Sequence, residues 1–458
     1  MFFRLILSAL ILVGTASAQA PSAVGDWQGI LDAGAQKLRL VFHIQQGDAD
    51  TLTATMDSLD QGAMGIPVNS VLLENRNLTI RMPNIGMSYS GELSGNGQQI
   101  AGTFRQGGGE LPLTLHRQTA SERTAAKPVR SQIPLKPYPY EEQDVEFENP
   151  AASGVRIACT LTSPRGDGSF PAVSLLSGSG PHKRDQENFG HPLGLVLADF
   201  LTRKGIAVLR CDDRGVGKSA APRETLSSIT YQDMASDASA MVNYLKENKK
   251  VNARKIGLIG HSEGGVVAPL AATSNADVSF LILLAGLGVT GETSILAQKQ
   301  AVLRANGVAS PDISVDRAVY QAILSGADEQ TVRKTASPMV ASMPSTAQEN
   351  YFRTILSPYW KFMLAYDPIP TLERLEVPVL ALFGEKDIQV LPELNAQPMR
   401  EVAEKAQDQR ITVKILPGLN HLFQPSSTGS LAEYGQIEET ISPVVLDYMN
   451  EWLMRILK

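Results

Sequence analysis

The run Gly260-His261-Ser262-Glu263-Gly264 places a serine between two glycines, and it is the part of the chain best suited to chemistry. The apolar run KIGLIGH precedes it and the helix-like run GGVVAPLAA follows, so Ser262 should lie on a tight turn between a strand and a helix. Such a turn needs glycines because larger side chains would collide with neighbouring elements. It also places the serine at a helix N-terminus, where developing negative charge is favoured. The pattern predicts that Ser262 is a nucleophile.

A serine hydroxyl is a weak nucleophile at neutral pH, so Ser262 needs a base. After such an elbow the acid and the base follow in the chain order Ser, Asp or Glu, His. Of the six histidines only His421, in LPGLNHLF, lies downstream of the serine. His261 is expected to point away from Ser262 because side chains alternate along a strand. The remaining histidines lie upstream: His43, His116, His182 and His191. Elimination predicts His421 as the base.

The acid is expected in the loop that follows the preceding strand, VPVLALFG. Asp387 lies there, and a carboxylate at that point could bond the far nitrogen of the imidazole and fix its tautomer. Glu385 in the same loop is the alternative, and Asp387 is favoured because it lies deeper in the loop.

An oxyanion needs two converging N–H donors. One donor is predicted to be the N–H of Glu263, the residue after the nucleophile. The second should come from the small-residue loop SGSGP after the strand AVSLL, where the backbone can approach a substrate carbonyl closely. The N–H of Ser179 is predicted, with that of Gly178 as the alternative.

The run from Arg210 to Ser219, RCDDRGVGKS, has two glycines and a lysine but lacks the spacing of a phosphate-binding loop. We interpret it as a loop that acidic residues brace at the rim of the site. Arg214 is expected to pair with a nearby carboxylate rather than with substrate.

Continuous apolar strands alternate with amphipathic helices through residues 141–458, which indicates a parallel sheet covered on both faces. The alternation is interrupted at about 288–368 by helical stretches, far longer than an ordinary connection of about 2–6 residues. We interpret this interruption as a helical cap over the strand ends, where ligands bind in such sheets.

Residues 19–117 are predicted to form a small all-β domain, a barrel or a sandwich. Apolar residues alternate in LRLVFHI, LTIRM and LPLTLHR, and turn residues separate these short strands. Residues 118–140 contain four prolines and no clear period, as is typical of an extended linker.

Residues 1–18 have the layout of a secretory signal peptide, with Arg4, then an apolar run, then Ala16-Ser17-Ala18. The apolar run is shorter than the ~20 residues that span a bilayer, so no stable membrane anchor is expected. The predicted location is periplasmic or secreted, which would permit a disulfide. Cys159 and Cys211 nevertheless lie in strand-like runs, and we expect two buried thiols.

The net charge of −6 gives no electrostatic reason to expect nucleic acid as a partner. Neither cysteine has the spacing of a zinc site, and no cofactor or metal is predicted. The expected partner is a small molecule, and the sequence does not indicate an oligomeric state.

These residues resemble the α/β-hydrolase superfamily, and more narrowly the bacterial two-domain carboxylesterases of its serine-aminopeptidase-like branch. The resemblance lies in LLSGSGPHKRDQENFGH, ADFLTRKGIAVLRCDDRGVGKS, IGLIGHSEGG, LFGEKD and GLNH, which together cover most of residues 141–458. The N-terminal DQGAMGIPV and GTFRQGGGELPL are similar to the β domain of the same esterases. The resemblance implies an α/β-hydrolase sheet with a cap, and carboxylesterase activity on short acyl esters.

Two other functions stay open. The same branch contains peptidases and thioesterases, so an exopeptidase or a thioesterase with the same triad is an alternative. A binding protein on a degenerate hydrolase scaffold, acting through its β domain, is disfavoured because the triad is intact.

Overall fold

The computed structural model describes residues 22–32, 37–47, 51–59, 63–106, 109–119, 130–341, 343, 345–406 and 410–458. The predicted signal peptide, residues 1–18, lies outside this range, as does most of the first half of the predicted linker.

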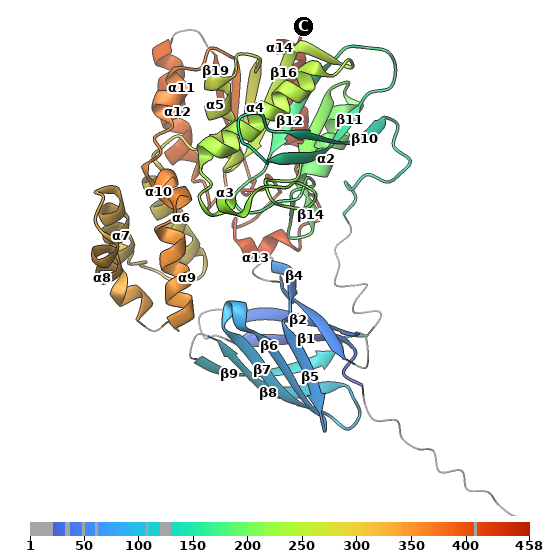
Figure 1. Ribbon diagram of the computed structural model, residues 1–458, viewed down its shortest axis with the longest axis vertical. Coiled ribbons are helices and arrows are strands. Elements are labelled where there is room, and N and C mark those ends of the chain that lie inside the picture. Colours follow the sequence, from blue (N-terminus) through green and yellow to red (C-terminus); the bar gives the residue numbers. More distant parts are fainter. Residues whose placement is uncertain are drawn as a thin grey trace, which may run out of the picture.

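The N-terminal strands form one antiparallel sheet that closes on itself (Figure 1). Closure follows because β1 pairs with both β2 and β9, and β2 pairs onward with β3. β4 pairs with β3 beside the closed ring. The domain is therefore a barrel, one of the two predicted architectures. Its strands are β1 (Gly25–Asp32), β2 (Lys37–Gln46), β3 (Leu52–Ser58), β4 (Ala63–Pro67), β5 (Ser70–Glu74), β6 (Asn77–Met82), β7 (Met87–Leu93), β8 (Gln99–Gln106) and β9 (Gly109–Arg117).

Side chains fill the barrel interior. Trp27, Phe42 and Tyr89 are fully buried there. The hydroxyl of Tyr89 donates to the carbonyl oxygens of Ile100 and Leu113, at 2.9 and 3.2 Å, and the indole N–H of Trp27 donates to the Ala23 carbonyl oxygen at 2.7 Å, so both polar groups have partners. The apolar core of the barrel is separate from that of the following domain.

The second domain has an eight-stranded sheet in the order β10-β11-β15-β12-β16-β17-β18-β19. β10 and β11 run antiparallel at one edge, and the strands from β15 to β19 are parallel. β16, β17 and β18 are almost wholly buried where they cross the centre, which explains their continuous apolar sequences. The strands are β10 (Glu141–Glu148), β11 (Arg156–Ser163), β12 (Phe170–Leu176), β15 (Ala207–Cys211), β16 (Val251–His261), β17 (Phe280–Leu284), β18 (Val379–Gly384) and β19 (Ile411–Leu416). A separate hairpin is formed by β13 (Glu187–Asn188) and β14 (His191–Pro192).

Helices pack against this sheet, α2 beside α14 and α4 beside α5. This arrangement confirms the predicted α/β fold. The helices are α2 (Leu193–Arg203), α3 (Arg223–Ser227), α4 (Tyr231–Glu247), α5 (Gly264–Ser274), α11 (Ile369–Glu373), α12 (Pro392–Ala406), α13 (Leu431–Tyr434) and α14 (Pro443–Ile456). No helix in the described ranges has both the length and the apolar character needed to cross a membrane.

A group of helices follows β17 and precedes β18 in the chain. It forms the side of the molecule drawn in yellow to orange in Figure 1. We call this group the cap. It contains α6 (Gly291–Ala305), α7 (Ser314–Leu324), α8 (Glu329–Val340), α9 (Ser345–Ile355) and α10 (Pro358–Ala365).

Cys159 and Cys211 form a disulfide, so the expectation of two buried thiols is wrong. The two residues lie directly opposite each other on the paired strands β11 and β15. The two cysteines are 52 residues apart, and the register between β11 and β15 brings them together. The hydrophobic pattern of each strand does not reveal this register.

Candidate active site

Ser262 lies between the end of β16 and the start of α5, with a positive φ of 53°. A left-handed backbone is uncommon for a residue with a side chain and is often found at functional sites. Two hydrogen bonds hold it: the Ser262 N–H donates to the Leu284 carbonyl (2.8 Å), and the Ser262 carbonyl accepts from the Gly265 N–H (2.9 Å).

The flanking glycines are sterically required. A Cβ on Gly260 would lie 2.0 Å from the Gly264 carbonyl oxygen, and a Cβ on Gly264 would lie 2.5 Å from the Leu176 carbonyl oxygen. These contacts are with backbone atoms, which cannot swing away as a side chain could. The elbow therefore has the packing reason for its glycines that the sequence suggested.

His421 and Asp387 meet in the loops that follow β19 and β18. Their Nδ1 and Oδ2 atoms are 2.7 Å apart, and both residues are buried. The other carboxylate oxygen of Asp387 accepts from the N–H groups of Gln389 (2.7 Å) and Val390 (2.9 Å). An ionised carboxylate can only accept, so an ionised Asp387 requires Nδ1 of His421 as the donor, and Nε2 of a neutral imidazole is then the acceptor. This is the tautomer that a general base needs.

The rival acid, Glu385, is directed elsewhere. Its carboxylate accepts from the Gly418 N–H at 2.8 Å, and its side chain is exposed. Of the two carboxylates in this loop, the one bonded to His421 is that of Asp387.

His261 does not point away from this site, contrary to expectation. Its Nε2 donates to the carbonyl oxygen of His421 at 2.9 Å, and the two rings lie 4.8 Å apart between centroids. Alternation describes side chains within a strand, but His261 is the last residue of β16. The loop that carries His421 lies against the end of this strand. Burial lowers the pKa of His261 to about 3, so the ring is neutral and serves as a hydrogen-bond donor. His261 thus joins the base loop to the elbow.

The loop after β12 lies beside the elbow. A Cβ on Gly178 would lie 3.5 Å from the Cβ of Ser262 and 3.4 Å from Nδ1 of His261. Ser179 is exposed, and its carbonyl accepts from Nε2 of His182 at 3.1 Å. The structure brings the predicted donor loop to the serine, and the choice between the N–H groups of Ser179 and Gly178 stays a prediction.

Asp213 ties both ends of this loop together. Its two carboxylate oxygens accept from the hydroxyl of Ser177 (2.6 Å) and the N–H of His182 (2.7 Å), and its own N–H donates to the His182 carbonyl (2.9 Å). Burial raises the pKa of the Asp213 carboxyl. A single carboxylate, that of Asp213, therefore closes the loop Ser177–His182. The bracing predicted for the run Arg210–Ser219 itself comes from Asp212, whose Oδ2 accepts from the Lys218 N–H at 2.9 Å.

A second buried acid, Glu263, points toward the cap. Its carboxylate accepts from the hydroxyl of Tyr359 on α10 and from that of Tyr231 on α4. Burial raises the pKa of Glu263. The residue whose N–H is a predicted oxyanion donor is therefore held by its side chain between the cap and the sheet domain.

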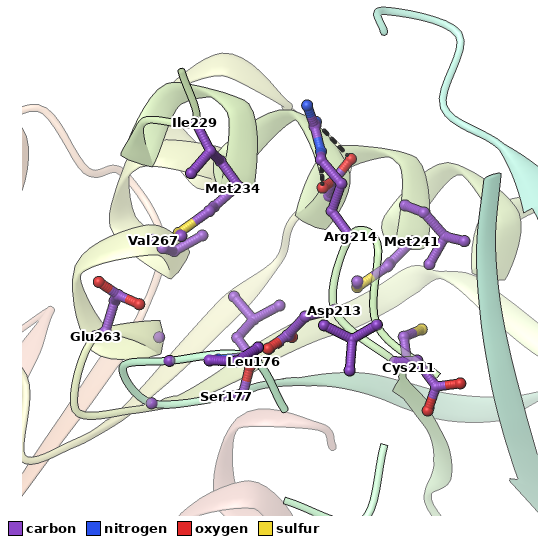
Figure 2. A pocket seen from close by; sticks show the side chains of 18 of the residues that line it. Leu176, Ser177, Cys211, Asp213, Arg214, Ile229, Met234, Met241, Glu263 and Val267 are labelled. Carbon is purple, nitrogen blue, oxygen red and sulfur yellow. Dashed lines mark hydrogen bonds and ion pairs between the residues drawn. The ribbon is translucent and has the colours of Figure 1, made fainter. Parts of the chain in front are cut away.

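A cavity of about 370 Å³ adjoins the elbow at Glu263 and Gly264 (Figure 2). Its walls are mainly apolar. Arg214 lies on its border and forms a two-pronged ion pair with Asp237, at 2.8 Å for both Nε and Nη2. This confirms that Arg214 pairs with a carboxylate.

Sequence reasoning missed the roles of Asp213, Glu263 and Tyr359 in holding the site. The acidic pair in RCDDRG was a usable signal for Asp213. The cap tyrosine carried none, because its partner lies 96 residues away in the chain. Within the described residues no group of three or more His, Cys, Asp or Glu side chains could hold a metal ion.

Comparisons with known proteins agree with this geometry. The profile of the serine aminopeptidase family S33 matches residues 195–424, half of the chain and including both Ser262 and His421. The chain is 25% identical to Esterase EstD of Thermotoga maritima over 323 residues, which are 70% of this chain and 69% of that protein.

Two solved structures illustrate the structural neighbourhood. The α/β hydrolase GrgF from Penicillium sp. sh18 has 19% identity and a TM-score of 0.42, over 69% of this chain and 98% of that one. The Pyrococcus furiosus esterase Pf2001 has 17% identity and a TM-score of 0.41, over 69% and 90%. With the elbow, the sheet topology and the family profile in agreement, the chain belongs to the serine aminopeptidase (S33) family of α/β-hydrolases.

Proposed function

We propose that this hydrolase is a carboxylesterase that cleaves esters of short acyl chains through the triad Ser262, His421 and Asp387. The observation that carries the proposal is the buried 2.7 Å contact between His421 and Asp387 at the strand edge where the elbow lies. The esterase activity named for the Thermotoga relative supports an ester substrate.

The proposed reaction follows from this geometry. His421 Nε2 takes the proton of the Ser262 hydroxyl as its oxygen attacks the acyl carbon, and the imidazolium is stabilised by Asp387. The N–H groups of Glu263 and Ser179 bind the oxyanion. His421 then gives the proton to the leaving alcohol, and an acyl-enzyme remains. Water, deprotonated by His421, attacks the acyl carbon and releases the acid with regeneration of the Ser262 hydroxyl.

Ser262→Ala tests the mechanism. We expect kcat on p-nitrophenyl butyrate to fall at least ~10⁴-fold, because removing the nucleophile of a triad costs about as much as removing the whole triad. Covalent labelling by a fluorophosphonate should vanish in the same variant. Turnover close to wild type, or labelling that persists, would refute the assignment.

An exopeptidase is the second candidate, because the matching family is described as serine aminopeptidases. An aminoacyl arylamide and the matching aryl ester, compared at equal concentration, separate the two. A higher kcat/KM on the arylamide would replace the esterase assignment.

We also propose that the protein is exported to the periplasm or the medium after cleavage behind Ala18. The Cys159–Cys211 disulfide supports export, since disulfides persist in oxidising compartments. N-terminal sequencing of protein recovered outside the cytoplasm should begin at Gln19. Recovery of the intact chain from the cytoplasm alone would contradict export.

A further inference from the structure

The cavity beside the elbow is a space between the loop after β12, the start of α5 and helix α4. One end is bordered by Glu263, a proposed oxyanion donor, by Gly178, the alternative second donor, and by Gly264, whereas Ser179 does not border the cavity. At about 370 Å³ the cavity is far larger than an acetyl group needs. At ~30 Å³ for each water-sized group, it has room for about a dozen non-hydrogen atoms.

Met241 borders the cavity on the side away from Glu263. In Figure 2 the side chains of Glu263 and Met241 lie on opposite sides of the space, with Cys211 below Met241. The Sδ atom of Met241 is held at 3.3 Å from the hydroxyl of Ser174, which donates to it from the buried strand β12. This anchored thioether therefore forms a defined end wall.

The side walls suit an uncharged chain. The apolar residues that border the space include Ile157, Leu176, Leu226, Ile229, Met234 and Val267. Arg214 is the one cation among the lining residues, all of which lie in the described part of the chain. Its guanidinium forms an ion pair with Asp237. Asp213 and Glu263 also border the space. A negatively charged chain would meet carboxyls and no available cation.

We infer that this cavity binds the acyl chain of the ester, that it selects neutral chains up to about ten carbons, and that Met241 sets the upper limit. The inference rests on the proposed esterase function and adds the class of acid and the residue that limits its length. One methylene in an apolar pocket is worth roughly tenfold or more in kcat/KM, so a fitted chain should be strongly preferred to acetyl.

Met241→Ala tests the inference with two series of esters. One series varies the acyl chain from acetyl to hexadecanoyl on p-nitrophenol, and the other varies the alcohol on a constant butyryl group. The substitution removes three non-hydrogen side-chain atoms from the end wall. We expect the preferred acyl chain to lengthen by two to three carbons and the ratio of kcat/KM for dodecanoyl over octanoyl to rise at least ~10-fold. The alcohol profile should keep its shape.

Met399→Ala is the matched control. Met399 is also buried in the protein, on α12, but does not border the cavity. Its truncation should lower stability with no change in either profile. A longer alcohol preference in Met241→Ala, or an unchanged acyl profile, would overturn the inference.

Wild-type protein gives a test that does not depend on the folding of a variant. The rate of inactivation by p-nitrophenyl alkylphosphonates should rise with alkyl length to about ten carbons and then fall, and a terminal carboxylate on the octyl chain should reduce it at least ~10-fold. A rate that is flat with length, or indifferent to the carboxylate, refutes the pocket. Failure of the proposed function gives different results: phosphonates of every length would leave Ser262 unmodified if it were not the nucleophile, and the arylamide comparison would favour the arylamide if the protein were an exopeptidase.

Discussion

The carboxylate of Asp213 offers a sharp test of how the loop Ser177–His182, which carries a proposed oxyanion donor, is held. Asp213→Asn keeps the shape of the side chain but leaves one acceptor where there were two. Because the Ser177 hydroxyl and the His182 N–H both donate to the native carboxylate, the amide NH₂ of the variant must face one of these donors. One charge-assisted hydrogen bond is lost, worth about 1.5–3 kcal/mol.

If that loss appears as a displacement of the loop Ser177–His182, kcat should fall roughly 10- to 100-fold, since ~1.4 kcal/mol corresponds to a factor of ten. The donor acts on the oxyanion and not on the ground-state ester, so KM should change little. The measurement is kcat and KM on p-nitrophenyl butyrate, normalised to active sites titrated with a fluorophosphonate.

Asp316→Asn is the control for the loss of a buried carboxylate. Asp316 is 5% exposed and pairs with Lys299 inside the cap, away from the loop. It should lower the free energy of unfolding and leave kcat per titrated site unchanged. The reasoning fails if Asp213→Asn keeps kcat within about twofold, or if only KM rises.

Three further predictions concern the acid, the disulfide and the barrel. Asp387→Asn should lower kcat by about 10⁴-fold through the wrong tautomer of the imidazole, whereas Glu385→Gln should cost less than about tenfold; equal losses in steady-state assays would undo the assignment of the acid. Replacing Cys159 and Cys211 together by serine should lower the free energy of unfolding by about 2–5 kcal/mol in denaturant titrations, and an unchanged midpoint would contradict a structural disulfide. In the barrel, a hydrogen bond to Asp57, helped by one to Asp26, raises the pKa of His43 to about 8. The resulting stabilisation, about 1–2 kcal/mol after allowance for solvent screening, is complete below pH ~6.5 and disappears as the pH rises through 8. His43→Gln should flatten this part of the pH profile, and a wild-type barrel that becomes more stable from pH 6.5 to 9 would refute it.

The positions of Ser262, Asp387 and His421 in the fold could be predicted because they depend on chain order and on strand ends. Parallel strands bring their carboxyl ends to one edge, so the loops that carry Ser262, Asp387 and His421 must converge whatever the details of packing. The sheet and the helical insertion were readable for a similar reason, since buried parallel strands have continuous apolar sequences.

Features that depend on register and on distant contacts were not readable. The pairing of β11 with β15 places Cys159 opposite Cys211, and no periodicity reports on a partner strand. The position of His261 depends on where the His421 loop crosses the end of β16. The link between Tyr359 and Glu263 depends on how the cap docks. Closure of the barrel likewise requires the pairing of β1 with β9, which alternation within each strand does not encode.

The disulfide has a consequence for the acidic residues that follow it. Successive residues of a strand face opposite sides, and the chain leaves β15 with Asp212 bonded to Arg184 and Asp213 bonded to the loop Ser177–His182. A slip of β15 by one residue against β11 would bring Asp212 to the place of Asp213, or Asp213 to the place of Asp212. The disulfide therefore fixes the register of β15 against β11. With that register Asp213 bonds to the loop Ser177–His182, and its neighbour Asp212 pairs with Arg184.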